Sequence, residues 1–177
     1  MPTHHLSRRL VGVATTALAV AGITLAASSP GHATTTTTTT YVRINAGPSP
    51  LVNMAIHVPS SANGAQALLQ PFNNATAGQW EIIPVGSVVG AIQFKNRYSH
   101  QCLRSQAPLY GDSVVQDVCN IHDPRQFWIR TQDPVLPVWH VFNLGNVRYL
   151  AAPNVGVGTV TASYSATDTK QMWQMWS

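Results

Sequence analysis

Three copies of one stretch of sequence, spaced 47 residues apart, are the strongest constraint on the fold of this chain. Gly64, Gly111 and Gly158 follow one another at that step, which aligns the stretches AIHVPSSANG, CLRSQAPLYG and YLAAPNVGVG. The second residue of each stretch is an isoleucine or a leucine. A repeat of this length indicates one structural unit used three times, with each unit too small to bury its own apolar face. The three units are therefore expected to pack around a shared core.

Each repeat closes on a tryptophan, and two of the three repeats carry the same Gln-x-Trp tripeptide. The closing residues are Trp80, Gln126 with Trp128, and Gln171 with Trp173. A buried indole contributes a large apolar area, and the glutamine before it satisfies nearby backbone groups. We therefore predict that these residues are core residues of the repeat, with ligand contact as the alternative.

The rest of the pattern is typical of an all-β protein. Short runs rich in Val, Ile, Thr, Phe and Trp are broken by Gly, Pro and Asn, and long helical periodicity is absent from residues 41–177. Three β units that close on one another are expected to form a barrel capped by hairpins, because that arrangement leaves no exposed sheet edge.

The two cysteines, Cys102 and Cys119, both lie in the middle repeat. In an exported chain, an even pair in neighbouring segments favours a disulfide, with two buried thiols as the alternative. Equivalent interior positions would keep their total volume, so each repeat is expected to hold a disulfide or one large and one small side chain. Sliding by one repeat gives Ala55 with Phe72, and Tyr149 with Ala166.

The N-terminal residues have the layout of an export signal. Two arginines precede the apolar run 10–27, and small residues follow it. We predict a signal peptide over residues 1–33, a threonine-rich spacer over 34–40 and one domain over 41–177, in a secreted, extracellular protein. The alternative is a transmembrane anchor, which the weak hydrophobicity of a run rich in Ala, Gly and Thr disfavours.

Charge and motifs exclude several classes of function. Residues 41–177 carry eight Lys and Arg and six Asp and Glu, so their net charge is near +2. The basic residues are scattered, which gives nucleic-acid binding no support. The sequence has no Gly-x-Ser-x-Gly elbow and no His-Glu-x-x-His motif, and Glu81 is its only glutamate. We predict a non-enzymatic domain without metal or cofactor, and without membrane contact after signal cleavage.

The phased repeats resemble the ricin-B-type (R-type) lectins, whose domains occur in exported bacterial proteins of the actinobacterial type. The resemblance covers essentially residues 41–177. It rests on AIHVPSSANGAQ in the first repeat, CLRS…GDSVVQDVC…RQFW in the middle repeat and YLAAP…GTVTASYS…KQMW in the third. It implies an all-β fold, a β-trefoil of three repeats with a hairpin cap. It also implies binding of carbohydrate, typically galactose-like or xylan-like sugars, without catalysis or a metal.

The family's sugar-binding residues are not kept in this chain. In place of the carboxylate after the Cys-Leu pair stand His57, Arg104 and Ala151. In place of the aromatic residue before the second cysteine stand Gln70, Asp117 and Tyr164. In place of the asparagine before the Gln-x-Trp glutamine stand Arg125 and Lys170, and the first repeat has Gly78 instead of that glutamine. The resemblance therefore implies degenerate sites, with His57, Arg104, Asp117, Arg125, Tyr164 and Lys170 as candidate contacts.

Two functions are consistent with these departures. In the first, His57, Arg104 and Arg125 favour an acidic glycan or polysaccharide through charge-assisted hydrogen bonds. In the second, the sugar sites are inactive and the domain is a scaffold for another secreted protein, since a fold alone does not fix function. Protease inhibition belongs to the second class, because Kunitz-type inhibitors share the β-trefoil fold, although the Gln-x-Trp signature argues against that branch.

Overall fold

The computed structural model of the chain describes residues 38–47, 53–106, 113–153, 158–163 and 169–177. Within these ranges every regular element is a β-strand or a short 3-10 helix, which confirms the all-β class. No helix in the same ranges is long and apolar enough to cross a membrane. The strands are β1 (Tyr41–Ala46), β2 (Met54–His57), β3 (Leu68–Pro71), β4 (Trp80–Pro84), β5 (Ala91–Asn96), β6 (Cys102–Ser105), β7 (Val114–Asp117), β8 (Trp128–Gln132), β9 (Trp139–Asn143), β10 (Arg148–Ala151), β11 (Gly158–Thr159), β12 (Thr161–Ser163) and β13 (Met172–Trp176). The 3-10 helices are η1 (Thr76–Gly78), η2 (Pro124–Gln126) and η3 (Thr169–Gln171).

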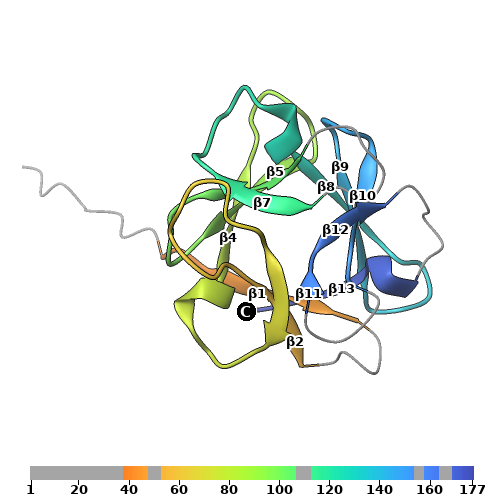
Figure 1. Ribbon diagram of the computed structural model, residues 1–177. Helices are drawn as coiled ribbons and strands as arrows, with labels where there is room; N and C mark the ends of the chain where they lie inside the picture. The colour runs from red at the N-terminus through yellow and green to blue at the C-terminus, as the bar shows by residue number, and fades with distance from the viewer. Residues whose placement is uncertain (1–37, 48–52, 107–112, 154–157, 164–168) are drawn as a thin grey trace, which may run out of the picture. The chain divides into compact units, whose positions relative to one another are not determined.

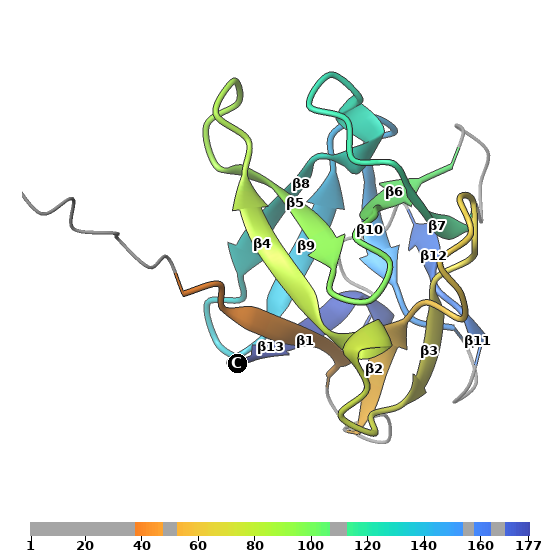
Figure 2. The same cartoon turned by 90° about the vertical axis from the view of Figure 1, so that its left-hand side faces the viewer.

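Six of the strands pair in a closed ring and form a barrel (Figure 1, Figure 2). β1 pairs with β4 and β13, β13 with β9, β9 with β8, β8 with β5, and β5 with β4, so the ring has no free edge. The hairpins β2–β3, β6–β7 and β10–β12 form the cap, and β11 pairs with β3. Figure 1 shows three similar lobes around a common centre. This is the capped barrel that the three repeats predict.

A ring of three backbone hydrogen bonds joins the three repeats. Ala67 N donates to Val114 O (2.8 Å), Val114 N to Val160 O (3.0 Å), and Val160 N to Ala67 O (3.0 Å). All three residues are fully buried. Because each repeat donates to the next and the last returns to the first, these bonds mark the pseudo-three-fold axis of the molecule.

The third repeat is one residue shorter than the uniform step predicts. Cys102 pairs with Asp117 in the β6–β7 hairpin, whereas Tyr149 pairs with Ser163 in the β10–β12 hairpin. The strand equivalent of Asp117 in the third repeat is therefore Ser163, and the alignment with Tyr164 is wrong by one position. Tyr164 itself lies outside the described residues.

The three repeat-closing tryptophans lie in the core, and each makes the same hydrogen bond. Their side chains are fully buried. In every repeat the indole N–H donates to the backbone carbonyl of the aligned apolar residue, which ties β4, β8 or β13 to the preceding hairpin. The bonds are Trp80 Nε1 to Ile56 O (2.9 Å), Trp128 Nε1 to Leu103 O (3.0 Å) and Trp173 Nε1 to Leu150 O (2.9 Å).

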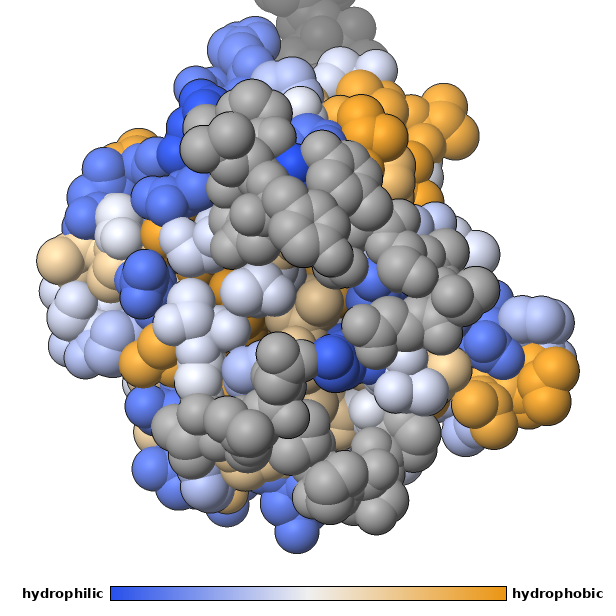
Figure 3. All heavy atoms as spheres, turned by 45° about the vertical axis from the view of Figure 1, so that its right-hand side comes forward, coloured by the Kyte–Doolittle hydropathy of each residue, from blue (hydrophilic) through white to orange (hydrophobic). Residues whose placement is uncertain are grey.

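Exposed hydrophobic side chains are dispersed. On the face drawn in Figure 3, hydrophobic groups stand apart from one another among hydrophilic ones. Within the described ranges, the large exposed hydrophobic residues lie in connections or at strand ends rather than along one sheet face. They are Val89, Tyr98, Val118, Ile121, Val135, Leu136, Val147 and Trp176.

Candidate functional site

The structure brings some of the predicted contacts together and separates the others. Arg104 on β6, Asp117 on β7 and Arg125 in η2 meet beside the hairpin of the middle repeat. His57 ends β2 in the first repeat, and Lys170 lies in η3 of the third. The candidate site is therefore built in the middle repeat.

Asp123 joins the predicted residues into one network, which we call the middle-repeat cluster (Arg104, Asp117, Asp123 and Arg125). Arg104 Nε donates to Asp123 Oδ2 at 2.8 Å and lies 3.6 Å from Asp117 Oδ2. Arg125 Nε donates to Asp123 Oδ1 at 3.1 Å. The side chains of Arg104 and Asp123 are 15 % exposed, and that of Arg125 is 40 % exposed. The cluster is thus a partly buried ion-pair network at the surface.

Asp123 is not among the candidate contacts that the sequence predicts, although the sequence around it carries a local signal. Asp123 stands directly before Pro124, the first residue of η2, and its side chain accepts a hydrogen bond from Arg125 N at 3.1 Å. Aspartate at the N-cap followed by proline is a favoured start of a helical turn. The cap fixes the Asp123 carboxylate between the two arginines.

The pKa of Asp123 lies below its ordinary value. Burial alone would raise the pKa of this carboxyl group, but hydrogen bonds from Arg104 and Arg125 to the ionised form outweigh that effect. A lowered pKa means that the ionised carboxylate stabilises the fold above the unfolded-state pKa of 3.8, and that this contribution is lost as the pH falls through the folded-state value.

Asp123→Asn should therefore lower the free energy of unfolding by about 1–2 kcal/mol near pH 7, because it removes charge-assisted hydrogen bonds from two arginines. The deficit should shrink below about pH 4, where the parent carboxylate becomes protonated. Urea unfolding of parent and variant across this range checks the expectation. A deficit that stays constant down to about pH 2 would contradict it.

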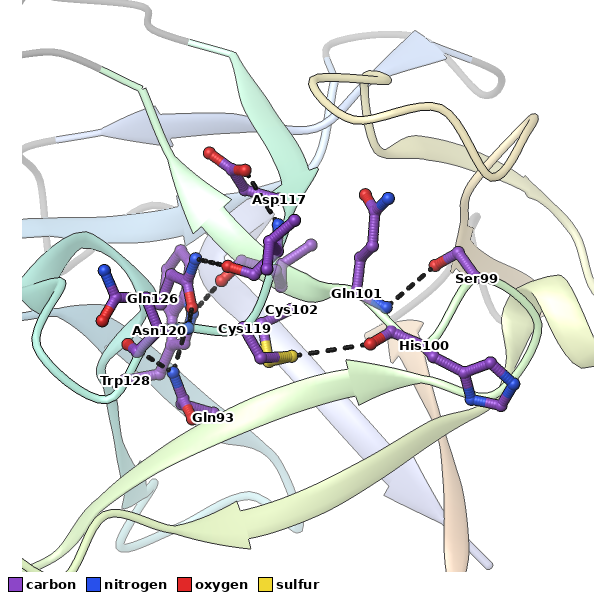
Figure 4. Close-up of a disulfide and its surroundings, with 12 residues drawn as sticks. Gln93, Ser99, His100, Gln101, Cys102, Asp117, Cys119, Asn120, Gln126 and Trp128 are labelled. Atoms are coloured by element: carbon purple, nitrogen blue, oxygen red, sulfur yellow. Dashed lines mark hydrogen bonds between the residues drawn. A yellow bond between two sulfur atoms is a disulfide. The ribbon is translucent and has the colours of Figure 1, made fainter.

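A disulfide and one glutamine hold the segment that carries Asp123. Cys102 and Cys119 form the predicted disulfide, with Cα atoms 4.9 Å apart. Gln126 Oε1 accepts from Asn120 N at 2.8 Å and from Gln93 Nε2 at 3.0 Å, and Gln126 Nε2 donates to Val118 O at 2.8 Å. Figure 4 shows this amide between Gln93 and Asn120, beside the disulfide. The segment from Val118 to Asp123 is therefore fixed before any ligand binds.

The expected large-and-small pairs are seen only in part. In the first repeat, Ala55 is fully buried, while Phe72 is half-buried and its ring lies 6.1 Å from that of His57. In the third repeat Tyr149 is half-buried, and Ala166 lies outside the described residues.

His57 lies in the interior rather than at a sugar-binding surface. Its ring is 4 % exposed and occupies the space beside Gly78, where the other repeats carry the Gln-x-Trp glutamine. Burial lowers the pKa of His57, which favours the neutral imidazole. In the first repeat, the His57 ring therefore fills the space that the glutamine side chain fills in the other two repeats.

Gly78→Ala should destabilise the protein by about 1–3 kcal/mol, because overpacking a dense core forces side chains to shift. An added Cβ would lie 2.6 Å from His57 Cε1. In a His57→Ala background the same substitution should cost much less, since its three nearest neighbours all belong to that ring. A double-mutant cycle measured by urea unfolding checks this coupling. Equal costs in both backgrounds would show that His57 does not fill the space.

The third repeat offers a less complete arrangement within the described residues. Lys170 is half-buried, and its backbone carbonyl accepts a hydrogen bond from Ala152 N at 2.8 Å. Gln171 is fully buried behind it. Tyr164, the other contact predicted for this repeat, lies outside the described residues.

The middle-repeat cluster places hydrogen-bond donors and acceptors side by side without net charge. Its two guanidinium groups are balanced by two carboxylates. Among the residues that the structure describes, Nη1 and Nη2 of Arg104 have no partner and are not buried. Asp117 Oδ1 accepts from Val118 N at 2.8 Å, which leaves lone pairs on Oδ2. In the described ranges, no three His, Cys, Asp or Glu side chains gather as metal ligands.

The sequence matches no protein-family model, and no curated protein matches it. Solved structures do match it. The designed three-fold symmetric protein ThreeFoil superposes with a TM-score of 0.69 at 18 % identity, over 77 % of this chain and 98 % of that one. The BEL beta-trefoil superposes with a TM-score of 0.64 at 13 % identity, over 76 % of this chain and 90 % of that one.

The fold is a β-trefoil. A lectin from Polyporus squamosus, solved with the influenza-binding epitope Neu5Aca2-6Galb1-4GlcNAc, also matches, with a TM-score of 0.66 at 18 % identity. The match covers 77 % of this chain and 48 % of the lectin, so the trefoil spans about half of that protein. At these identities the likeness establishes the fold that the chain shares with lectins.

Proposed function

We propose that the chain is a secreted, non-enzymatic carbohydrate-binding domain whose middle repeat holds a site for a neutral saccharide. The observation that carries this proposal is the middle-repeat cluster, in which the Arg104 guanidinium group lies beside Asp117, with Nε 3.6 Å from Asp117 Oδ2. Adjacent hydroxyl groups of a sugar need both an acceptor and a donor. A carboxylate beside a guanidinium supplies both, with charge-assisted strength.

The balance of charge favours a neutral over an acidic ligand at this site. Arg104 and Arg125 each hold a hydrogen bond to Asp123, so their charges are already compensated. An acidic sugar would have to approach two carboxylates as well as two guanidinium groups. This distinguishes the site from the acidic-glycan hypothesis that the sequence suggested for Arg104, Arg125 and His57.

Preorganisation also supports binding at this place. The disulfide and the Gln126 amide fix the segment from Val118 to Asp123. Contacts held in place by rigid surroundings lose less entropy when a ligand binds. A disulfide is also typical of proteins in oxidising, extracellular compartments, which agrees with the predicted signal peptide.

The test is a titration of the purified protein with neutral saccharides, namely galactose and xylose oligomers, by calorimetry. Asp117→Asn and Arg104→Gln should each weaken binding about tenfold or more, the loss of one buried charged hydrogen bond. Asp133→Asn is the matched control, because Asp133 is a carboxylate paired with His140 at 3.3 Å in a separate loop. Unchanged affinity in both site variants, or no binding of neutral saccharides, would contradict the proposal.

A scaffold function in protease inhibition is the second candidate, and one loop favours it. Asp133 Oδ1 accepts hydrogen bonds from Val135 N and Leu136 N, both at 2.9 Å, while Val135 is 85 % exposed. A rigid loop with an exposed side chain is the form of a reactive site. Residual activity of a protease panel with excess protein tests this function; inhibition that Val135→Gly abolishes would support it, and an unaffected panel would remove it.

A further inference from the structure

A second concave site lies on the barrel wall, away from the middle-repeat cluster. It is a pocket of about 460 Å³, which we call the barrel-wall pocket. β1 and β13 form one side of it, where Arg43 pairs with Trp176 across the strands. Figure 2 shows the C-terminal end of β13 next to β1. The lining residues include Tyr41, Arg43, Phe72, Gln79, Arg97 and Trp176.

Two arginines in this pocket are held by aromatic rings. Arg43 Cζ lies 4.7 Å from the centroid of the Phe72 ring, and Arg97 Cζ lies 4.6 Å from that of Tyr41. Arg97 Nη1 also donates to Gln79 Oε1 at 2.6 Å. Stacking on a ring fixes the plane of a guanidinium group while leaving most of its N–H donors free for a ligand.

No carboxylate compensates these two charges within the described residues. Neither Arg43 nor Arg97 has an ion-pair partner within 4.0 Å there, in contrast to Arg104 and Arg125. Glu81 is the nearby acid on β4, where it pairs with Tyr41 on one side and Lys95 on the other. Glu81 is not among the lining residues, so the described part of the pocket has two arginine side chains and no acidic side chain.

Trp176 gives the pocket an apolar surface at its edge. Its side chain is 50 % exposed, and it also lines a neighbouring hollow of about 250 Å³ with Trp139, Gln174 and Met175. The two hollows therefore meet at an indole. Exposed indole is an amphipathic surface with a large apolar face, which suits the C–H face of a sugar ring.

We propose that the barrel-wall pocket binds an acidic saccharide, with its carboxylate or sulfate group between Arg43 and Arg97 and a sugar ring against Trp176. The volume lies in the range of about 300–1,000 Å³ that small-ligand pockets occupy. The adjoining hollow gives room for a second sugar unit. This site shares no residue with the middle-repeat cluster, so it goes beyond the neutral-saccharide function proposed above and does not depend on it.

The experiment is a calorimetric titration of the purified protein with galacturonic acid oligomers and, as neutral counterparts, galactose oligomers. The acidic oligomers should bind, and raising the salt concentration should weaken them, since the contacts are charged. Arg43→Gln and Arg97→Gln should each lower the affinity about tenfold or more, and Trp176→Ala about threefold or more. Lys95→Gln is the matched control, because it removes an equal charge from a half-buried residue on β5 that lines neither this pocket nor the middle-repeat cluster.

Each possible result either supports or contradicts acidic-saccharide binding at the barrel-wall pocket. Galactose 6-sulfate in place of the uronic acid identifies which anionic group is preferred, and binding of either supports the proposal. Equal losses in Lys95→Gln and Arg43→Gln, or no binding of either acidic saccharide, would overturn it. Inorganic sulfate that competes fully while Trp176→Ala has no effect would show an anion site without a saccharide. Arg104→Gln separates the two sites, because it should weaken neutral binding about tenfold or more and leave acidic binding intact.

Discussion

Replacing Trp128 by alanine should lower the free energy of unfolding by about 3–5 kcal/mol, which is a large part of the stability of a domain this size. The indole is fully buried, and its Nε1 donates to Leu103 O at 3.0 Å. The substitution leaves a cavity in the core and a buried carbonyl without its donor. Both costs arise where the closing strand of the repeat meets its hairpin.

Urea unfolding measures this effect, and the chain supplies its own comparison. Trp80→Ala and Trp173→Ala should fall in the same range, because each indole is fully buried and makes the equivalent hydrogen bond. Trp176→Ala should cost no more than about 1 kcal/mol, since that side chain is 50 % exposed. Similar costs at Trp128 and Trp176 would show that the repeat-closing position is not what stabilises the fold.

Removing the disulfide should have the next largest effect. Cys102→Ser with Cys119→Ser should lower the free energy of unfolding by about 3 kcal/mol, because the bond closes a short loop of the unfolded chain. The residues are 17 positions apart. Cys119 also belongs to the segment that carries Asp123, so saccharide binding at the middle-repeat cluster should weaken together with stability.

Urea unfolding and calorimetric titration of this double variant check both effects. Cys102→Ala with Cys119→Phe is a sharper comparison, since Ala55 and Phe72 stand at the same positions of the first repeat. If the repeats are equivalent, this pair should recover part of the stability that the serine pair loses. A serine variant as stable as the parent, or two free thiols in the intact mass of the parent, would contradict the assigned role of the bond.

The features predictable from the sequence are those that recur at fixed spacing. The three Gln-x-Trp-like endings and the aligned apolar residues identify both partners of the indole hydrogen bonds. Barrel closure follows because three small β units bury their apolar faces only against one another. The disulfide follows from two cysteines in neighbouring segments of one repeat.

Other features depend on pairings that no local pattern records. Ala67 and Val114 are 47 residues apart (114 − 67), but Val114 and Val160 are 46 apart (160 − 114). Because Leu150 still follows Leu103 by 47 (150 − 103), the residue missing from the third repeat falls between Leu150 and Val160. No sequence pattern marks this deletion. His57 occupies an aligned position but is buried, because Gly78 in the same repeat vacates the space of a glutamine. The sequence did carry one signal for this packing change: His57 and Gly78 both differ from the family pattern, and both lie in the first repeat.

The barrel-wall pocket could not be found from the sequence at all. Its residues come from β1, from connections of the first and middle repeats and from the end of β13. They meet only because the first and last strands pair in one register, with Arg43 opposite Trp176. The arginines are scattered in the sequence, so the sequence alone does not show that they have two kinds of environment. Arg104 and Arg125 pair with aspartates, whereas Arg43 and Arg97 stack on aromatic rings.

The most direct test of the proposed saccharide site is a nuclear magnetic resonance titration that follows the arginine Nε–H signals as galactose or xylose oligomers are added. With a neutral-saccharide site in the middle repeat, the signals of Arg104 and Arg125 should move with the neutral oligomer while those of Arg43 and Arg97 stay in place. The indole signals of the three buried tryptophans should also stay in place. Signals that do not move, or that move only for Arg43 and Arg97, would contradict a neutral-saccharide site in the middle repeat.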